Sequence, residues 1–320
     1  MRHAALLIYL CLIAAPPGSA QQVNIPAEIT DEATLPRVMP RFAKAVIAFQ
    51  QAAGPAELTS LFRSQLVAGF YGEALTSLDM LRAPLADDPS PRVRARYLDY
   101  VLYVRPRLAA KQRKTAFQAA YRETFHALIR PLDDRTAAMA VNGLSFDNLS
   151  QANQALAQDL NQLKGKAAIS LSEASKLIRD YGDREVYRAF GATSSGLITA
   201  EDARRYAVQM DVAVALRDGA SICALIVRPL KQGQLPALLH FTIYNDEGSL
   251  FREARRAASN GYAGVIGLTR GKGCNPGEII PYEHDGADAA ALVDWIAAQP
   301  WSNGKVGMYG GSYLDLPVHR

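Results

Sequence analysis

A serine with glycine neighbours near the end of the chain has the surroundings of a catalytic nucleophile. Gly310, Gly311 and Ser312 follow an apolar run with the composition of a β-strand. A serine held on a sharp strand-to-helix turn needs small neighbours, because larger side chains do not fit such a turn. The helix after the turn would offer backbone N–H groups to the oxyanion of an acyl-transfer intermediate. The alternative interpretation is a glycine-rich turn that ends a strand.

A serine hydroxyl is a weak nucleophile and needs a histidine base that a carboxylate orients. His126 falls in a helical pattern, and His284 precedes the start of a helix at the surface. His240 alternates within a strand that we expect to be buried on both faces, so we predict a core histidine bonded to a neighbour. His319 belongs to a short terminal tail. None of these forms a convincing triad with Ser312.

The elements that would position this serine lie in the last third of the chain. Asp218-Gly219 separates two β-branched, apolar runs and predicts a hairpin. The pattern after the hairpin alternates strands with helices, which predicts a parallel sheet. We expect strands at 208–216, 221–229, 237–244, 262–268 and 306–309, and helices at 249–258 and 285–298.

The preceding part of the chain has a different periodicity. Between residues 30 and 206 the apolar residues recur every three to four positions, which indicates helices. The predicted fold class is therefore α/β, with an all-α domain at 21–205 followed by a partial α/β domain at 206–320.

An ordered series of short matches makes the last third of the chain similar to a known family. The series includes Val227-Arg228-Pro229, Thr269-Arg270-Gly271, Asp294-Trp295-Ile296, Asn303-Gly304-Lys305 and Gly311-Ser312-Tyr313. It resembles the Xaa-Pro dipeptidyl-peptidase and cocaine-esterase group, the CocE/NonD α/β hydrolases, over about residues 206–314. The resemblance implies a serine hydrolase that acts on esters or on amide bonds after proline. The expected partner is accordingly a small peptide or ester substrate.

The resemblance also implies roles for three residues. Ser312 would be the nucleophile, the backbone N–H of Tyr313 one oxyanion donor, and the hydroxyl of Tyr244 the other. A neutral phenol O–H stabilises a tetrahedral oxyanion without ionising. Without the resemblance, Tyr244 is better interpreted as a strand-end aromatic that packs on the sheet.

The chain departs from the family pattern after Leu314, where Asp315 stands in place of the usual glycine. In this fold the triad acid and histidine follow the serine on later turns, and eight residues follow Ser312 here. We therefore expect a truncated gene product or a fragment, inactive as a hydrolase. The alternative is a helical binding or scaffolding protein with an unidentified protein partner and a vestigial hydrolase segment.

The first twenty residues predict export. An apolar run at 4–15 follows Met1-Arg2-His3 and ends at Pro16-Pro17, and small residues precede a predicted cleavage after Ala20. We expect a periplasmic or secreted protein with no membrane-spanning segment after cleavage, since no other apolar stretch is long enough.

Charge and cysteine usage exclude several classes of protein. Thirty-five basic and 31 acidic residues leave a formal charge of +4, which gives no argument for a nucleic-acid partner. Cys11, Cys223 and Cys274 lack the spacing of a zinc site or of a disulfide framework. We therefore expect no metal, no cofactor, and two free thiols at Cys223 and Cys274.

Overall fold

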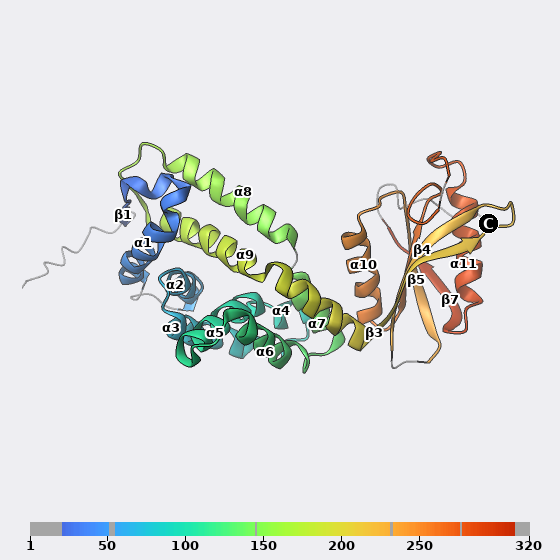
Figure 1. Ribbon diagram of the computed structural model, residues 1–320, viewed down its shortest axis with the longest axis horizontal. Coiled ribbons are helices and arrows are strands. Elements are labelled where there is room, and N and C mark those ends of the chain that lie inside the picture. Colours follow the sequence, from blue (N-terminus) through green and yellow to red (C-terminus); the bar gives the residue numbers. More distant parts are fainter. Residues whose placement is uncertain (1–20, 51–54, 145, 231–232, 276, 311–320) are drawn as a thin grey trace, which may run out of the picture. The chain divides into compact units, whose positions relative to one another are not determined.

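The computed structural model describes residues 21–50, 55–144, 146–230, 233–275 and 277–310 (Figure 1). The chain divides into two compact units. One comprises Met1–Ala74 and Ala152–Arg184, and the other comprises Leu75–Gln151 and Glu185–Arg320. Helix α9 contributes its first part to one unit and its second part to the other.

The first unit is mainly helical. Its helical elements are the 3₁₀ turns η1 (Ala27–Thr30) and η2 (Glu32–Thr34), α1 (Leu35–Gln50), α2 (Pro55–Val67), the start of α3 (Tyr71–Arg82), most of α8 (Phe146–Leu163) and the first part of α9 (Leu171–Arg205). The short strands β1 (Gln22–Asn24) and β2 (Ala168–Ser170) pair antiparallel through Val23 and Ile169, both buried. The sequence predicted only helices here, because three-residue strands are too short to show an alternating pattern.

The helical part of the second unit packs around aromatic side chains. Its elements are the end of α3, the 3₁₀ turn η3 (Ala83–Leu85), α4 (Pro91–Arg94), α5 (Leu98–Arg113), α6 (Phe117–Ile129), α7 (Asp134–Asn142) and the second part of α9. Tyr121 is fully buried with its ring centroid 5.5 Å from that of Phe190, and its hydroxyl bonds Ser194 Oγ at 2.7 Å. Burial raises the pKa of Tyr121 to about 12, so the phenol stays neutral. Helix α9 is interrupted at Gly191, whose φ of 35° suits glycine.

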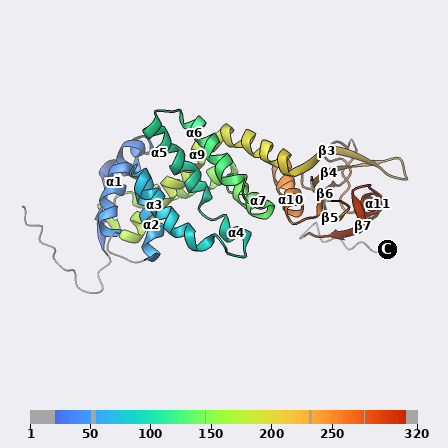
Figure 2. The ribbon, with the colours of Figure 1, turned by 90° about the horizontal axis from the view of Figure 1, so that it is seen from below.

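The sheet of the second unit has five described strands. They are β3 (Tyr206–Ala215), β4 (Ser221–Pro229), β5 (Leu235–Thr242), β6 (Ala263–Leu268) and β7 (Ser302–Met308), in the spatial order β3-β4-β6-β5-β7 (Figures 1 and 2). Strands β3, β4 and β6 are antiparallel neighbours, whereas β5 runs parallel to both β6 and β7. This mixed sheet, preceded by helices, confirms the predicted fold class.

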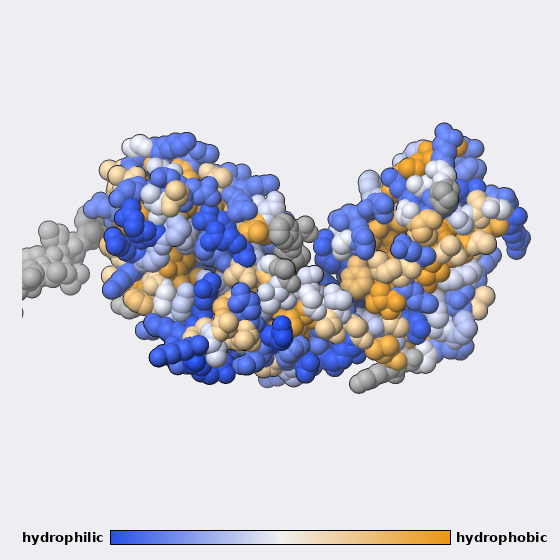
Figure 3. All heavy atoms as spheres, in the orientation of Figure 1, coloured by the Kyte–Doolittle hydropathy of each residue, from blue (hydrophilic) through white to orange (hydrophobic). Residues whose placement is uncertain are grey.

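One helix covers each face of the sheet (Figure 1). Helix α10 (Glu247–Ser259) buries Leu250 and Ala254 against β4 and β6, and α11 (Asp285–Ala297) buries Leu292 on the opposite face. A Cβ at Gly264 of β6 would overlap the backbone carbonyl of Ala254, so only glycine allows α10 this close. Apolar surface is also visible on the part that carries the sheet (Figure 3).

The change from helix to strand falls between Arg205 and Tyr206. The buried guanidinium of Arg205 fixes this junction, since its Nε donates to Glu201 Oε1 at 2.7 Å and its Nη2 to Ile129 O at 3.0 Å. The division into domains at this point stays a prediction. Among the described helices, none is long and apolar enough to cross a membrane.

Candidate functional site

The three parallel strands end at the same edge of the sheet. In the register of β5 and β7, Leu239 lies opposite Met308, and the next residue, Tyr309, donates its N–H to Leu239 O at 3.1 Å. The segment that leads toward Ser312 therefore runs beside the strand that leads to Tyr244. Ser312 and Tyr313 themselves lie outside the described residues, as does the predicted leader at residues 1–20.

Tyr244 follows β5 by two residues and stands at this edge. Its N–H donates to Thr242 Oγ1 at 3.0 Å, which fixes the turn after the strand. The side chain is 57% exposed, and no hydrogen bond to its hydroxyl is found among the described residues. Such exposure does not fit an aromatic packed on the sheet. The role of Tyr244 as an oxyanion donor stays a prediction.

A buried carboxylate ties the loop after β6 to the start of α11. Asp285 is 1% exposed, accepts a hydrogen bond from the Thr269 hydroxyl, and accepts the N–H of Tyr282 at 3.0 Å. Thr269 also donates its N–H to Thr242 O at 3.0 Å, which connects the loops after β5 and β6. An acidic residue in the first turn of a helix is favoured by the helix dipole. These contacts make the edge next to Tyr244 a fixed surface.

The guanidinium of Arg270 is held between two carboxylates. It donates Nε and Nη2 to Asp288 and Nη2 to Asp218, each at 2.7 Å. The pKa of Arg270 is raised, chiefly by the hydrogen bonds to Asp288, and the bond to Arg270 lowers the pKa of Asp218. With its charge neutralised in this way, Arg270 is not available for an anion. The sequence placed Asp218 in a hairpin turn and did not reveal this network.

A disulfide joins Cys223 of β4 to Cys274, with the two Cα atoms 5.4 Å apart. The prediction of two free thiols is therefore wrong. Cys223 pairs with Leu268 in the sheet, and the loop after β6 turns back toward it through Gly271 and Gly273, both with positive φ. A Cβ on Gly273 would meet Cys223 Sγ at 3.0 Å and Leu268 Cδ1 at 2.7 Å. This return of the chain depends on strand order, which cysteine spacing does not encode.

The described histidines do not form a base next to this edge. His240 is 8% exposed on β5, its ring centroid is 5.3 Å from that of Tyr309, and both its ring nitrogens are buried without a hydrogen-bond partner among the described residues. Its predicted burial is confirmed, but the predicted bond to a neighbour is wrong, because the ring lies against the ring of Tyr309 and neither nitrogen meets a hydrogen-bond partner there. Burial lowers the pKa of His240. His284 is half-buried, with its Nε2 3.9 Å from Glu283, and His126 is half-buried edge-on against Phe125.

The class of protein follows from this arrangement. An α/β hydrolase typically begins with an antiparallel hairpin, continues with parallel strands that carry helices on both faces, and has a glycine-flanked serine after one of these strands. The described sheet and the sequence after β7 have these features. Residues 218–316 match the family described as X-Pro dipeptidyl-peptidase (S15 family). This match confirms that this part of the chain resembles the CocE/NonD, Xaa-Pro dipeptidyl-peptidase-like hydrolases.

Several known proteins are similar to this segment. A cocaine esterase of Rhodococcus is 37% identical over 117 residues, which are 35% of this chain and 20% of the esterase. A protein of Mycobacterium bovis described as a putative serine esterase is 33% identical over 124 residues, with 31% of this chain and 20% of the relative covered. The chain thus spans about a fifth of the length of these curated relatives.

Two solved structures are also similar to this segment. A CocE/NonD family hydrolase of Staphylococcus aureus is 26% identical with a TM-score of 0.30, and the match covers 34% of this chain and 24% of that one. An α-amino acid ester hydrolase is 28% identical with a TM-score of 0.28, covering 35% and 22% of the two chains.

Proposed function

We propose that residues 206–314 supply the nucleophile and the oxyanion donors of a serine hydrolase that cleaves esters or amide bonds after proline. Ser312 attacks the carbonyl carbon, and the Tyr313 N–H and the Tyr244 hydroxyl stabilise the tetrahedral oxyanion. The relatives' names, cocaine esterase and putative serine esterase, support acyl transfer as the reaction class.

The parallel pairing of β5 with β7 is the observation that carries this proposal. It brings the strand before Ser312 beside the strand before Tyr244, as the bond from Tyr309 N to Leu239 O illustrates. A nucleophile and an oxyanion donor must converge on one carbonyl group, and neighbouring strands that end at the same edge allow this. The free, exposed phenol of Tyr244 supports the same assignment.

We further propose that the 320-residue chain does not turn over ester or Xaa-Pro substrates without an added base. Among the described histidines, His240 is buried within the sheet, His126 lies on α6, and His284 precedes α11 with its Nε2 3.9 Å from Glu283. Without an imidazole at the serine, the hydroxyl retains its proton and attacks slowly.

The nucleophile is tested by labelling with a fluorophosphonate probe in the presence and absence of excess imidazole. We expect slow labelling that imidazole accelerates and that Ser312→Ala abolishes. Equal labelling of the wild-type protein and of Ser312→Ala would overturn the assignment of the nucleophile. Hydrolysis of p-nitrophenyl esters without imidazole, at a Ser312-dependent rate, would overturn the statement about the missing base. In a Tyr244→Phe variant, we expect imidazole-supported labelling to fall by about tenfold to a thousandfold.

We also propose that the protein is exported and that residues 1–20 are removed. The leader pattern of the sequence supports this, and so does the Cys223–Cys274 disulfide, because disulfides persist mainly in oxidising compartments. Expression in a Gram-negative host, followed by fractionation and intact-mass measurement, tests both points. We expect a periplasmic protein that begins at Gln21 and carries no titratable thiol. A cytoplasmic product that retains Met1 would contradict the proposal.

A further inference from the structure

A carboxylate stands next to the disulfide that joins β4 to the loop after β6. Asp211 Oδ1 lies 3.8 Å from Cys223 Sγ, to which Cys274 Sγ is bonded. One oxygen of Asp211 and the two sulfurs all lie within 4.8 Å of one another. An oxygen and a sulfur bound to one tetrahedral zinc ion at about 2.0 and 2.3 Å are separated by about 3.5 Å. Asp211 is therefore spaced from Cys223 much as two ligands of a single metal ion are.

Asp211 reaches the sulfur from an irregular point in β3. The register of β3 with β4 shifts between Gln209 and Val212, and Asp211 has a φ of 51°. A bulge of this kind re-aims a side chain relative to the regular alternation of a strand. In the part of the chain that the structure describes, no basic side chain pairs with the Asp211 carboxylate. Its negative charge is therefore not balanced by a neighbouring cation.

A small cavity beside these atoms has an acidic lining. Its volume is about 160 Å³, and it is lined by β3, β4, the loop after β5 and the start of α10. Asp211, Cys223 and Glu247 take part in the lining, and among the described residues that line it none is basic. Two carboxylates without a cation in one cavity favour a bound cation. The space is enough for an ion with a water ligand, since about 10–15 Å³ admits one water.

The two cysteines differ in their access to solvent. Cys223 is 2% exposed, whereas Cys274 is exposed. A thiolate of a dithiol reductant can therefore attack Cys274 Sγ, which breaks the S–S bond and releases Cys223 as a thiolate that takes up a proton. The second thiol of the reductant then displaces Cys274 from the mixed disulfide. The protein disulfide gains two electrons and two protons, the reductant becomes a disulfide, and two thiols remain beside Asp211.

We propose that the reduced chain binds one Zn²⁺ ion through Cys223 Sγ, Cys274 Sγ and a carboxylate oxygen of Asp211, with water as the fourth ligand. Binding forms two zinc–sulfur bonds and releases both thiol protons, because the thiolate is the ligand. Sulfur and carboxylate ligands in a tetrahedron suit zinc. The disulfide and the zinc site are alternative states of the same two cysteines. The site is separate from the proposed acyl-transfer residues, none of which is a ligand.

Titration of the full chain with Co²⁺ tests the proposal, in a Cys11→Ser background that leaves Cys223 and Cys274 as the thiols. The protein is reduced with a phosphine, which adds no thiolate of its own. We expect thiolate-to-cobalt charge-transfer absorption that saturates at one ion per chain, together with the visible bands of tetrahedral cobalt. Zn²⁺ should displace the cobalt and abolish both signals, since thiolate ligands favour zinc. The oxidised protein should show neither signal, because its two sulfurs are bonded to each other.

Asp211→Asn tests the carboxylate ligand at an exposed position whose positive φ asparagine also adopts. We expect cobalt affinity to fall by about tenfold or more, since loss of even an outer-shell partner costs about 10–100-fold. The matched control is Glu278→Gln, which removes a carboxylate from the loop that carries Cys274 but outside the cavity lining. It should change affinity by less than about twofold.

Three results would overturn the proposal. The first is the absence of charge-transfer absorption in the reduced protein, and the second is the same absorption in the oxidised protein. The third is equal affinity of the Asp211→Asn variant and the wild-type protein, which would show chelation by the two thiolates alone. Circular dichroism checks that each variant is folded. Cys274→Ser is a further variant, in which we expect the charge-transfer absorption at saturation to fall by about half or more, because one of two thiolate ligands is lost.

Discussion

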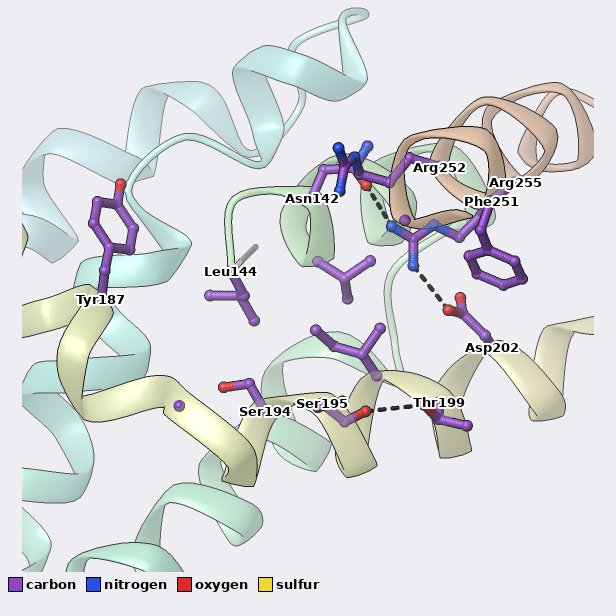
Figure 4. A pocket seen from close by; sticks show the side chains of 14 residues that line it. Asn142, Leu144, Tyr187, Ser194, Ser195, Thr199, Asp202, Phe251, Arg252 and Arg255 are labelled. Atoms are coloured by element: carbon purple, nitrogen blue, oxygen red, sulfur yellow. Dashed lines mark hydrogen bonds and ion pairs between the residues drawn. The ribbon is translucent and has the colours of Figure 1, made fainter. Parts of the chain in front are cut away.

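Replacing Arg255 by methionine should destabilise the contact between α10 and the helices that flank it. The Arg255 and Asp202 side chains are only 4% and 8% exposed, and Arg255 Nη1 lies 2.8 Å from Asp202 Oδ2 (Figure 4). Removing the guanidinium leaves a buried carboxylate without its counter-charge and leaves Asn142 Oδ1 without its donor. Breaking one side of such a buried pair costs about 3–5 kcal/mol of unfolding free energy.

The loss of unfolding free energy in Arg255→Met should be larger at high pH than at low pH. Burial raises the pKa of Asp202, and the charge of Arg255 opposes this rise. Without Arg255 the pKa of Asp202 in the folded protein rises further above its unfolded value. The folded variant then takes up a proton as pH falls, so the destabilisation is largest above the folded pKa and decreases toward the unfolded pKa near 3.9. We expect a larger loss at pH 8 than at pH 5.

Urea unfolding measures this loss through the fluorescence of Trp295 and Trp301, which are the tryptophans of the chain and lie in the α/β part. The control is Arg256→Met on the same helix, which is 65% exposed and should cost less than about 1 kcal/mol. The double variant Arg255→Met with Asp202→Leu should recover most of the stability, because it removes both buried charges. A single-variant loss below about 1 kcal/mol, or no recovery in the double variant, would refute the reasoning.

Three further predictions concern the sheet. Replacing both Cys223 and Cys274 by alanine should lower the unfolding free energy by up to about 4 kcal/mol, since the disulfide closes a loop with a sequence separation of 51. Equal urea midpoints for the wild-type protein and this double variant under oxidising conditions would contradict this. Burial lowers the pKa of His240, so the folded state binds fewer protons than the unfolded state, and the unfolding free energy should fall as pH drops below the ordinary imidazole value of about 6.5. His240→Phe should flatten this dependence of stability on pH. An unchanged pH dependence in the variant would exclude His240 as its source. Gly264→Ala should lower the unfolding free energy by at least about 1–3 kcal/mol, because its Cβ would overlap the backbone of α10. Gly286→Ala has open space around the new Cβ and should be close to neutral in the same urea unfolding experiments.

Much of the α/β part was predictable because its signals are local. The hairpin around Asp218-Gly219 and the runs now seen as β4, β6 and α11 follow from residue type and period within one segment. The β1–β2 pair was missed because a three-residue strand contains too few positions to establish a period. The predicted nucleophile, Ser312, stays a prediction from the motif and the family resemblance, since it lies outside the described residues.

By itself, the sequence determined the helical character of the first part, the main strands and helices of the α/β part, and the hydrolase family that the last third resembles, because periodicity and short motifs are carried by neighbouring residues. Only the tertiary structure decided that Cys223 meets Cys274 and that Asp218 and Asp288 share Arg270. The physical reason is that burial and charge pairing depend on which distant segments the order of the strands and the crossing of the helices bring together.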